Sequence, residues 1–113
     1  MHSILVVEDD EAIRSALVDA LTDQGYEAEC SSDGRRALRH LEQTTVDLVL
    51  VDVCMPAMTG PDMVRRLRGK GDATPIIMMS AQPARSLPPG VTFLRKPFDL
   101  DRLFKAIEEV LAS

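Results

Sequence analysis

The sequence predicts an α/β fold, in which a parallel β-sheet carries helices on both faces. Two runs, at residues 4–7 and 48–51, consist only of Ile, Leu and Val without polar alternation, which is typical of strands buried on both faces. Such runs alternate with segments whose apolar residues recur at helical spacing, and this alternation implies βαβ units. Polar residues follow several expected strands, at the edge where such sheets bind ligands.

The composition limits the class of protein. With 113 residues, 45% apolar and 27% charged, we expect one globular domain over residues 1–113. No apolar run approaches the ~20 residues of a membrane span, and the N-terminus lacks signal-peptide features. The net charge of −5 argues against direct binding to nucleic acid or membrane. Cys30 and Cys54 form no metal-binding motif, so we expect reduced thiols, a buried Cys30 and a cytoplasmic location.

The elements can be placed in chain order. The expected strands are residues 3–8, 26–30, 46–52, 75–80 and 91–95. The expected helices are residues 11–24, 34–43, about 60–69 and 99–112. Helix starts are indicated by Ser32-Asp33-Gly34 and Thr59-Gly60-Pro61, and a helix end by Gly25. The first helix gathers its apolar residues on one face: Ala12, Ile13, Ala16, Leu17, Ala20 and Leu21.

The segment at residues 81–90 departs from this alternation. Pro83, Pro88, Pro89 and Gly90 oppose a regular helix there. We therefore expect the fourth crossover to be a single helical turn or an irregular loop.

Carboxylates gather where two expected strands end. Glu8, Asp9 and Asp10 follow the first strand, and Asp52 ends the third. Clustered carboxylates raise one another's pKa, so they remain ionised together only beside a cation. Mg²⁺ prefers such oxygen ligands, and the backbone carbonyl of Cys54 can add another. We expect Asp9 and Asp52 as direct ligands, Glu8 as a ligand through water, and Asp10 as a bystander at the helix start.

Two further strand ends carry groups that suit phosphoryl transfer. A carboxylate can attack phosphorus to form an acyl phosphate, provided the transferred oxygens are neutralised and positioned. Besides Mg²⁺, Lys96 supplies a positive charge and Ser80 a hydroxyl donor. The set predicts an aspartyl phosphate on Asp52, whose added charge would bias a two-state switch.

Five motifs together resemble the receiver domains of two-component response regulators, and the resemblance covers nearly the whole chain. The motifs are ILVVEDD at 4–10, DLVLVDVCMP at 47–56, TG at 59–60, MMSA at 78–81 and FLRKPF at 93–98. The resemblance implies a flavodoxin-like, doubly wound parallel sheet of five strands in the order 2-1-3-4-5. It also implies a phosphoacceptor switch, not a turnover enzyme, that catalyses its own phosphorylation and dephosphorylation.

The resemblance assigns roles to individual residues. Asp52 would accept phosphate from a histidine kinase or phosphotransfer protein. Glu8 and Asp9, with Asp52 and the Cys54 carbonyl, would hold Mg²⁺ or Mn²⁺.

Further roles follow at the other strand ends. Ser80 would be the switch hydroxyl and Lys96 the phosphate-binding lysine, with a cis peptide bond to Pro97. Phe93 would be the aromatic switch residue, although a plain core aromatic is an equal reading.

The shortened fourth helix departs from the family pattern. That helix normally belongs to the output face, so the downstream target, or a fused effector domain, is not indicated by the sequence.

Two other functions remain open at this stage. A phosphohydrolase of the haloacid-dehalogenase type carries Asp-x-Asp at this strand end, whereas Asp52-Val53-Cys54 lacks the second acid. A receiver that binds partners without phosphorylation is the other alternative. The basic run from Arg65 to Lys70 is expected to be a solvated helix face.

Overall fold

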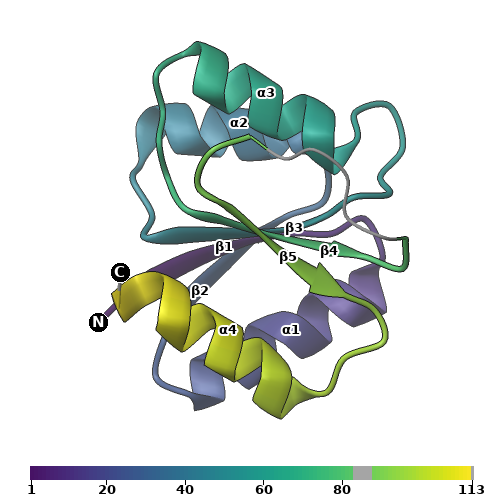
Figure 1. Ribbon diagram of the computed structural model, residues 1–113, viewed down its shortest axis with the longest axis vertical. Coiled ribbons are helices and arrows are strands. Elements are labelled where there is room, and N and C mark those ends of the chain that lie inside the picture. The colour runs from purple at the N-terminus through teal and green to yellow at the C-terminus, as the bar shows by residue number, and fades with distance from the viewer. Residues whose placement is uncertain (83–87, 113) are drawn as a thin grey trace.

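A five-stranded parallel sheet forms the centre of the molecule. The computed structural model describes residues 1–82 and 88–112. The strands lie in the order β2-β1-β3-β4-β5, which confirms the predicted order (Figure 1). Their bounds are Ser3–Val7 for β1, Glu27–Ser31 for β2, Leu48–Asp52 for β3, Ile76–Ser80 for β4 and Val91–Arg95 for β5.

Four helices cover the two faces of the sheet. They are α1 (Glu11–Asp23), α2 (Gly34–Gln43), α3 (Gly60–Gly69) and α4 (Leu100–Ala112). Figure 1 shows α2 and α3 on one face and α1 and α4 on the other. No helix in residues 1–82 and 88–112 is long and apolar enough to cross a membrane.

The alternation of side chains along each strand builds two cores. Leu5 and Val49 pack on the α2 and α3 side, whereas Ile4 and Leu48 pack on the α1 and α4 side. Every residue of β3 and β4 is buried, as continuous apolar strands require. Burial on both faces fixes the strands firmly, so the groups at their carboxyl ends have a rigid base.

Local side-chain caps determine where the helices begin. Asp10 accepts a hydrogen bond from the Ile13 amide at 3.0 Å, Asp33 accepts one from Arg36 at 2.8 Å, and Thr59 accepts one from Asp62 at 3.2 Å. The prediction that Asp10 acts at the helix start is therefore confirmed.

Two expectations about burial are wrong. Cys30 is exposed, because β2 is an edge strand of the sheet and most of its residues face solvent. Of the apolar face expected on α1, only Leu17 and Leu21 are buried, and Ile13 is 44% exposed. Ile13 lies at the sheet rim, where it lines a shallow hollow with Pro97 and Phe98 instead of packing against the strands.

The crossover between β4 and β5 is only partly described. Residues 81–82 and 88–90 are not helical, whereas the prediction of an irregular segment over residues 83–87 lies outside the described residues. Arg68 ties the end of this crossover to α3. Its Nε donates to the Pro89 carbonyl at 3.0 Å, and its Nη1 and Nη2 donate to the carbonyls of Asp72 at 2.8 Å and Thr74 at 3.0 Å.

The start of α3 lies directly against the backbone of β3. The Gly60 amide donates to the Val53 carbonyl at 3.0 Å. A Cβ at Gly60 would lie 2.7 Å from the Asp52 carbonyl oxygen, closer than real Cβ atoms approach. Glycine is therefore required here because two backbone segments meet.

We expect Gly60→Ala to lower the free energy of unfolding by about 1–3 kcal/mol, because α3 or the end of β3 must move. Gly69→Ala is the matched control, since a Cβ there meets nothing within 4 Å. That variant should be neutral or stabilising by up to about 1 kcal/mol. Urea unfolding of both variants measures the difference, and equal effects would contradict the role given to Gly60.

Candidate functional site

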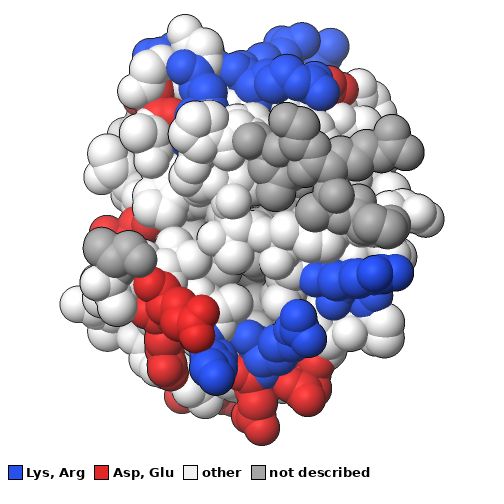
Figure 2. Space-filling view, viewed as in Figure 1, with Lys and Arg blue, Asp and Glu red and all other residues white. Residues whose placement is uncertain are grey.

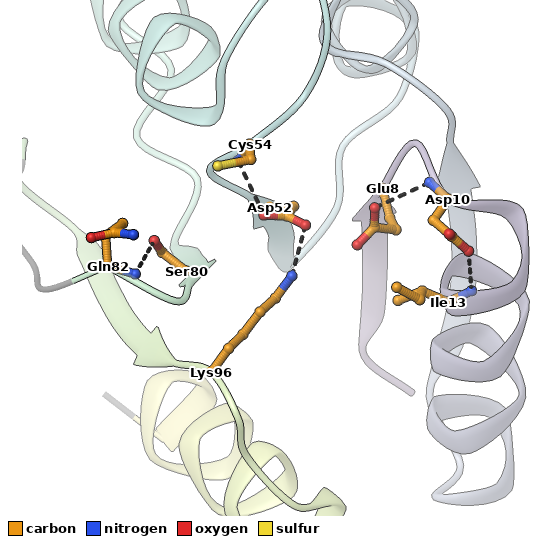
Figure 3. A network of polar contacts seen from close by, with 8 residues as sticks. All are labelled: Glu8, Asp10, Ile13, Asp52, Cys54, Ser80, Gln82 and Lys96. Carbon is orange, nitrogen blue, oxygen red and sulfur yellow. Dashed lines mark hydrogen bonds and ion pairs between the residues drawn. The ribbon is translucent and has the colours of Figure 1, made fainter.

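Asp52 stands at the centre of the carboxyl edge of the sheet. It ends β3 and is only 7% exposed. Its Oδ2 lies 2.8 Å from Lys96 Nζ, and its Oδ1 accepts a hydrogen bond from the Cys54 amide at 3.1 Å. In Figure 3, Glu8 lies on one side of Asp52 and Ser80 on the other, as expected from the order β1-β3-β4.

Lys96 reaches Asp52 from the segment that follows β5 (Figure 3). Its backbone amide donates to the Ser80 carbonyl at 2.8 Å, and its peptide bond to Pro97 is cis, as predicted. Burial alone would lower the pKa of Lys96. The hydrogen bond and charge of Asp52, with the charge of Glu8, outweigh that effect and raise the pKa, so Lys96 stays positively charged.

Glu8 is a buried carboxyl group that lacks part of its hydrogen bonding. It is 1% exposed, and its Oε2 accepts a hydrogen bond from the Asp10 amide at 3.1 Å. Its Oε1 is buried without a partner. Burial is the main cause that raises the pKa of Glu8 to about 7, and the neighbouring Asp9 and Asp52 carboxyls raise it further.

The metal prediction is supported by part of the geometry. Among residues 1–82 and 88–112, no three His, Cys, Asp or Glu side chains form a ready metal-binding group. Asp9 is exposed at the rim, next to Glu8 in sequence. Nevertheless, the unpartnered Glu8 oxygen and the mutual effects of these carboxyls fit a hard cation, because Mg²⁺ needs only one or two carboxylates and keeps several waters.

Ser80 ends β4, the strand next to β3, and Phe93 lies on β5, one strand further along the sheet. Ser80 is buried at the end of β4, and its Oγ accepts a hydrogen bond from the Gln82 amide at 3.0 Å. Its hydroxyl hydrogen is not used by that bond and can be donated. Phe93 is half-buried in β5, in register with Met78 of β4.

Sequence reasoning missed two residues that shape the site. Arg14 donates from Nη1 to the carbonyls of Glu8 at 2.9 Å and Asp9 at 3.3 Å, so it holds the acidic segment. Gly60 allows α3 to approach Asp52. The signals were an arginine in the first turn of a helix that follows acidic residues, and a glycine at the helix start, but neither is specific.

Comparison with known proteins agrees with the resemblance to receiver domains. The model of the response regulator receiver domain family matches residues 4–108. Response regulator MprA of Mycolicibacterium vanbaalenii is 38% identical over 114 residues, covering 96% of this chain and 49% of the relative. MprA of Mycobacterium tuberculosis is 37% identical, covering 96% of this chain and 50% of the relative. The chain therefore spans about half the length of these relatives.

Solved structures share the fold. Chemotaxis protein CheY4 of Vibrio cholerae is similar with a TM-score of 0.87 and 32% identity, over 97% of this chain and 98% of that chain. The receiver domain of the hybrid histidine kinase CckA has a TM-score of 0.85 and 36% identity, over 96% of this chain and 98% of that chain. TrrA of Thermotoga maritima, solved in complex with Mg²⁺-BeF, has a TM-score of 0.85 and 28% identity, over 97% of this chain and 99% of that chain.

The fold is the flavodoxin-like fold of signalling receiver domains. The chain belongs to the response regulator receiver domain family. Receiver domains receive phosphoryl groups from histidine kinases and generally bind Mg²⁺ at the phosphorylation site. It is thus a two-component signalling domain and not a classical turnover enzyme.

The raised pKa of Glu8 predicts a pH dependence of stability. The folded chain binds this proton more tightly than the unfolded chain, because the pKa rises from 4.5 to about 7. The stability that this group contributes is therefore fully present below about 4.5 and is lost as pH rises through about 7. Without divalent metal, we expect a loss on the order of 2–3 kcal/mol from this group.

Urea unfolding in chelator, followed from about pH 4.5 to about pH 8, measures that loss. Glu8→Gln should remove most of the dependence and be more stable than the parent at the upper end. Glu42→Gln is the control, because Lys70 lowers the pKa of Glu42 and its effect has the opposite sign. A parent-like pH slope in Glu8→Gln would contradict the role of Glu8.

Proposed function

We propose that this receiver domain, formed by residues 1–113, takes a phosphoryl group onto Asp52 in a Mg²⁺-dependent reaction and then changes its partner binding. One observation carries the proposal: Asp52 is 7% exposed at a strand end, with Lys96 Nζ 2.8 Å from its Oδ2. The Cys54 amide fixes Oδ1 of this carboxylate at 3.1 Å, while the lysine contact at Oδ2 can be exchanged for another partner. The phosphodonor is a histidine kinase or a phosphotransfer protein.

Groups that follow β1 and end β3 supply the oxygen ligands. Asp52, Asp9 and the Cys54 carbonyl would hold Mg²⁺ or Mn²⁺, and Glu8 would bind it through water. When bound, the ion neutralises charge on the transferred phosphoryl oxygens. Arg14 would keep Asp9 near the metal, because its guanidinium donates a hydrogen bond to the Asp9 carbonyl at 3.3 Å.

The transfer step needs only a carboxylate and charge neutralisation. An Asp52 oxygen forms the new bond to phosphorus, and the phosphorus–nitrogen bond of the donor phosphohistidine breaks, leaving its electron pair on the imidazole. Lys96 exchanges its contact with Asp52 Oδ2 for a phosphoryl oxygen. The ammonium group of Lys96 therefore moves with the negative charge, from the free carboxylate of Asp52 to the phosphoryl group of the acyl phosphate.

The switch step uses the hydroxyl of Ser80. Its donation to a phosphoryl oxygen would draw Ser80 toward Asp52, while its Oγ is bound to the Gln82 amide at 3.0 Å. Movement of Ser80 would thus pull on the segment that follows β4. The space left near β4 and β5 would then be open to Phe93, which is half-buried.

The site does not favour a phosphohydrolase. Such an enzyme needs a second acid two residues after the nucleophile, and Cys54 stands there. A domain that catalyses its own phosphorylation from small donors, and its own slow dephosphorylation, fits this composition. The output, through a downstream protein or a fused effector domain, is a separate matter. The lack of direct nucleic-acid binding and the cytoplasmic location remain predictions.

One observation favours the second candidate, a receiver that binds partners without phosphorylation. In the described residues no three side chains form a ready metal-binding group, and Asp9 is exposed. Metal binding therefore separates the two candidates.

Labelling with acetyl phosphate tests the proposal. The parent chain should form one acyl phosphate in Mg²⁺, seen as one added phosphoryl mass, and none in chelator. Asp52→Asn should abolish it, whereas Asp10→Asn should retain it, because Asp10 is occupied as the cap of α1. Equal labelling of Asp52→Asn would contradict the site. Failure to bind Mg²⁺ or beryllofluoride at millimolar concentration would support the second candidate, and rapid turnover of phosphate monoesters would support a phosphohydrolase.

A further inference from the structure

A polar pocket lies at the outer edge of the sheet, away from Asp52. It has a volume of about 600 Å³, within the range of small-molecule sites. It is bounded by the end of β2, by α2 and by Arg14 of α1. We call it the β2-edge pocket, and its lining residues are Arg14, Cys30, Ser31, Ser32, Arg36, Arg39, His40 and Gln43.

The charge of this pocket is opposite to that of the chain. The whole sequence has a net charge of −5, yet three arginines and one histidine line the pocket, without an Asp or Glu among the lining residues. Two carboxylates lie close by: Asp33 is 3.5 Å from Arg36, and Glu29 is 3.3 Å from His40. Arg39 forms no direct ion pair in the described part of the chain, although its charge helps to lower the pKa of the neighbouring Glu42 after the larger effect of Lys70. The pocket therefore retains excess positive charge.

The donors converge because of their positions on α2. Arg36, His40 and Gln43 follow helical spacing, so they project from one side of the helix. His40 Nε2 is buried and makes no well-aligned hydrogen bond, and its nearest charged neighbour is Glu29 Oε2 at 3.3 Å. The hydroxyls of Ser31 and Ser32 add donors from the end of β2.

The other basic surface of the molecule is different. Figure 2 shows Lys and Arg side chains gathered over α3. Three of these are already occupied: Arg65 pairs with Asp62 at 2.8 Å, Lys70 pairs with Glu42 at 2.6 Å, and Arg68 donates to backbone carbonyls. The β2-edge pocket also contains partnered arginines, since Arg14 donates to two backbone carbonyls and Arg36 lies 3.5 Å from Asp33. Arg39, in contrast, is a lining arginine that forms no direct ion pair among the described residues.

We propose that the β2-edge pocket binds a small molecule that carries two or more linked phosphate groups. Guanidinium groups recognise phosphate through paired hydrogen bonds, and three of them with an imidazole and hydroxyls match several phosphate oxygens. The pocket is open to solvent and limited in volume, so a short polyphosphate matches its size better than an extended polyanion. The proposal does not require phosphoryl transfer to Asp52, although Arg14 contacts both the pocket and the carbonyls of Glu8 and Asp9.

Titration with sodium pyrophosphate, in chelator and at constant ionic strength, tests the proposal by amide NMR. We expect saturable shifts at residues 30–32 and 36–43 at submillimolar to millimolar concentration. Arg39→Ala should weaken binding by about tenfold or more. Arg35→Ala is the matched control, since Arg35 is an exposed arginine on the same helix but does not line the pocket. It should change affinity by less than about twofold.

Three results would overturn the proposal. They are no saturable shifts at millimolar pyrophosphate, equal weakening by the two variants, and shifts centred on Asp52. A parallel titration with ADP distinguishes a nucleotide from free polyphosphate, and either one bound in the pocket supports the proposal. Hexaglutamate that binds with the same Arg39 dependence, when pyrophosphate and ADP do not, would show an acidic peptide site instead. Because chelator excludes divalent metal, failure here leaves the labelling of Asp52 unaffected.

Discussion

The site depends on two carboxyl groups that are buried at the ends of adjacent strands with one lysine against them. Glu8 is 1% exposed and Asp52 is 7% exposed, so neither can rely on water to stabilise its charge. Of these two carboxyl groups, Asp52 is the one to which Lys96 is hydrogen bonded. Asp52 therefore has an ammonium group directly against it, whereas burial raises the pKa of Glu8 to about 7. The rigid sheet keeps these groups close. A bound phosphoryl group or cation would therefore change the electrostatic interactions among Glu8, Asp52 and Lys96.

Rigid placement of those groups has a simple origin in the strands. The apolar residues of β1 and β3 are buried on both faces, and a one-residue shift of register would draw the carboxylates at the strand ends into the core, at a large desolvation cost. The carboxylates follow directly after the apolar residues. Their positions are therefore set by hydrophobic packing and not by the polar contacts that they make.

This origin explains which features the sequence could predict. The runs at 4–7 and 48–51, with caps such as Asp33 and Thr59, were sufficient to predict strands and helix starts, because each signal is local. The order of the strands is not a local property, and it was predicted from the resemblance to receiver domains. The juxtaposition of Asp52 and Lys96, 44 residues apart, followed from strand ends meeting at one edge.

Other features depend on how neighbouring elements cover one another. Periodicity indicated an apolar face on α1, but it did not show that Ile13 extends past the sheet, or that β2 leaves Cys30 exposed. The bonds from Arg14 to two carbonyls, and the close approach at Gly60, depend on the exact path of the backbone. Patterns of residue type carry no signal for contacts of this kind.

The exposed edge strand β2 has a further consequence for contact between copies of the chain. An edge strand offers free backbone groups to which another strand can add, and charged side chains oppose such pairing. Glu27 and Glu29 are both exposed on β2. Two copies that approached through this edge would place four carboxylates close together. The acidic edge thus discourages growth of the sheet from one molecule into the next.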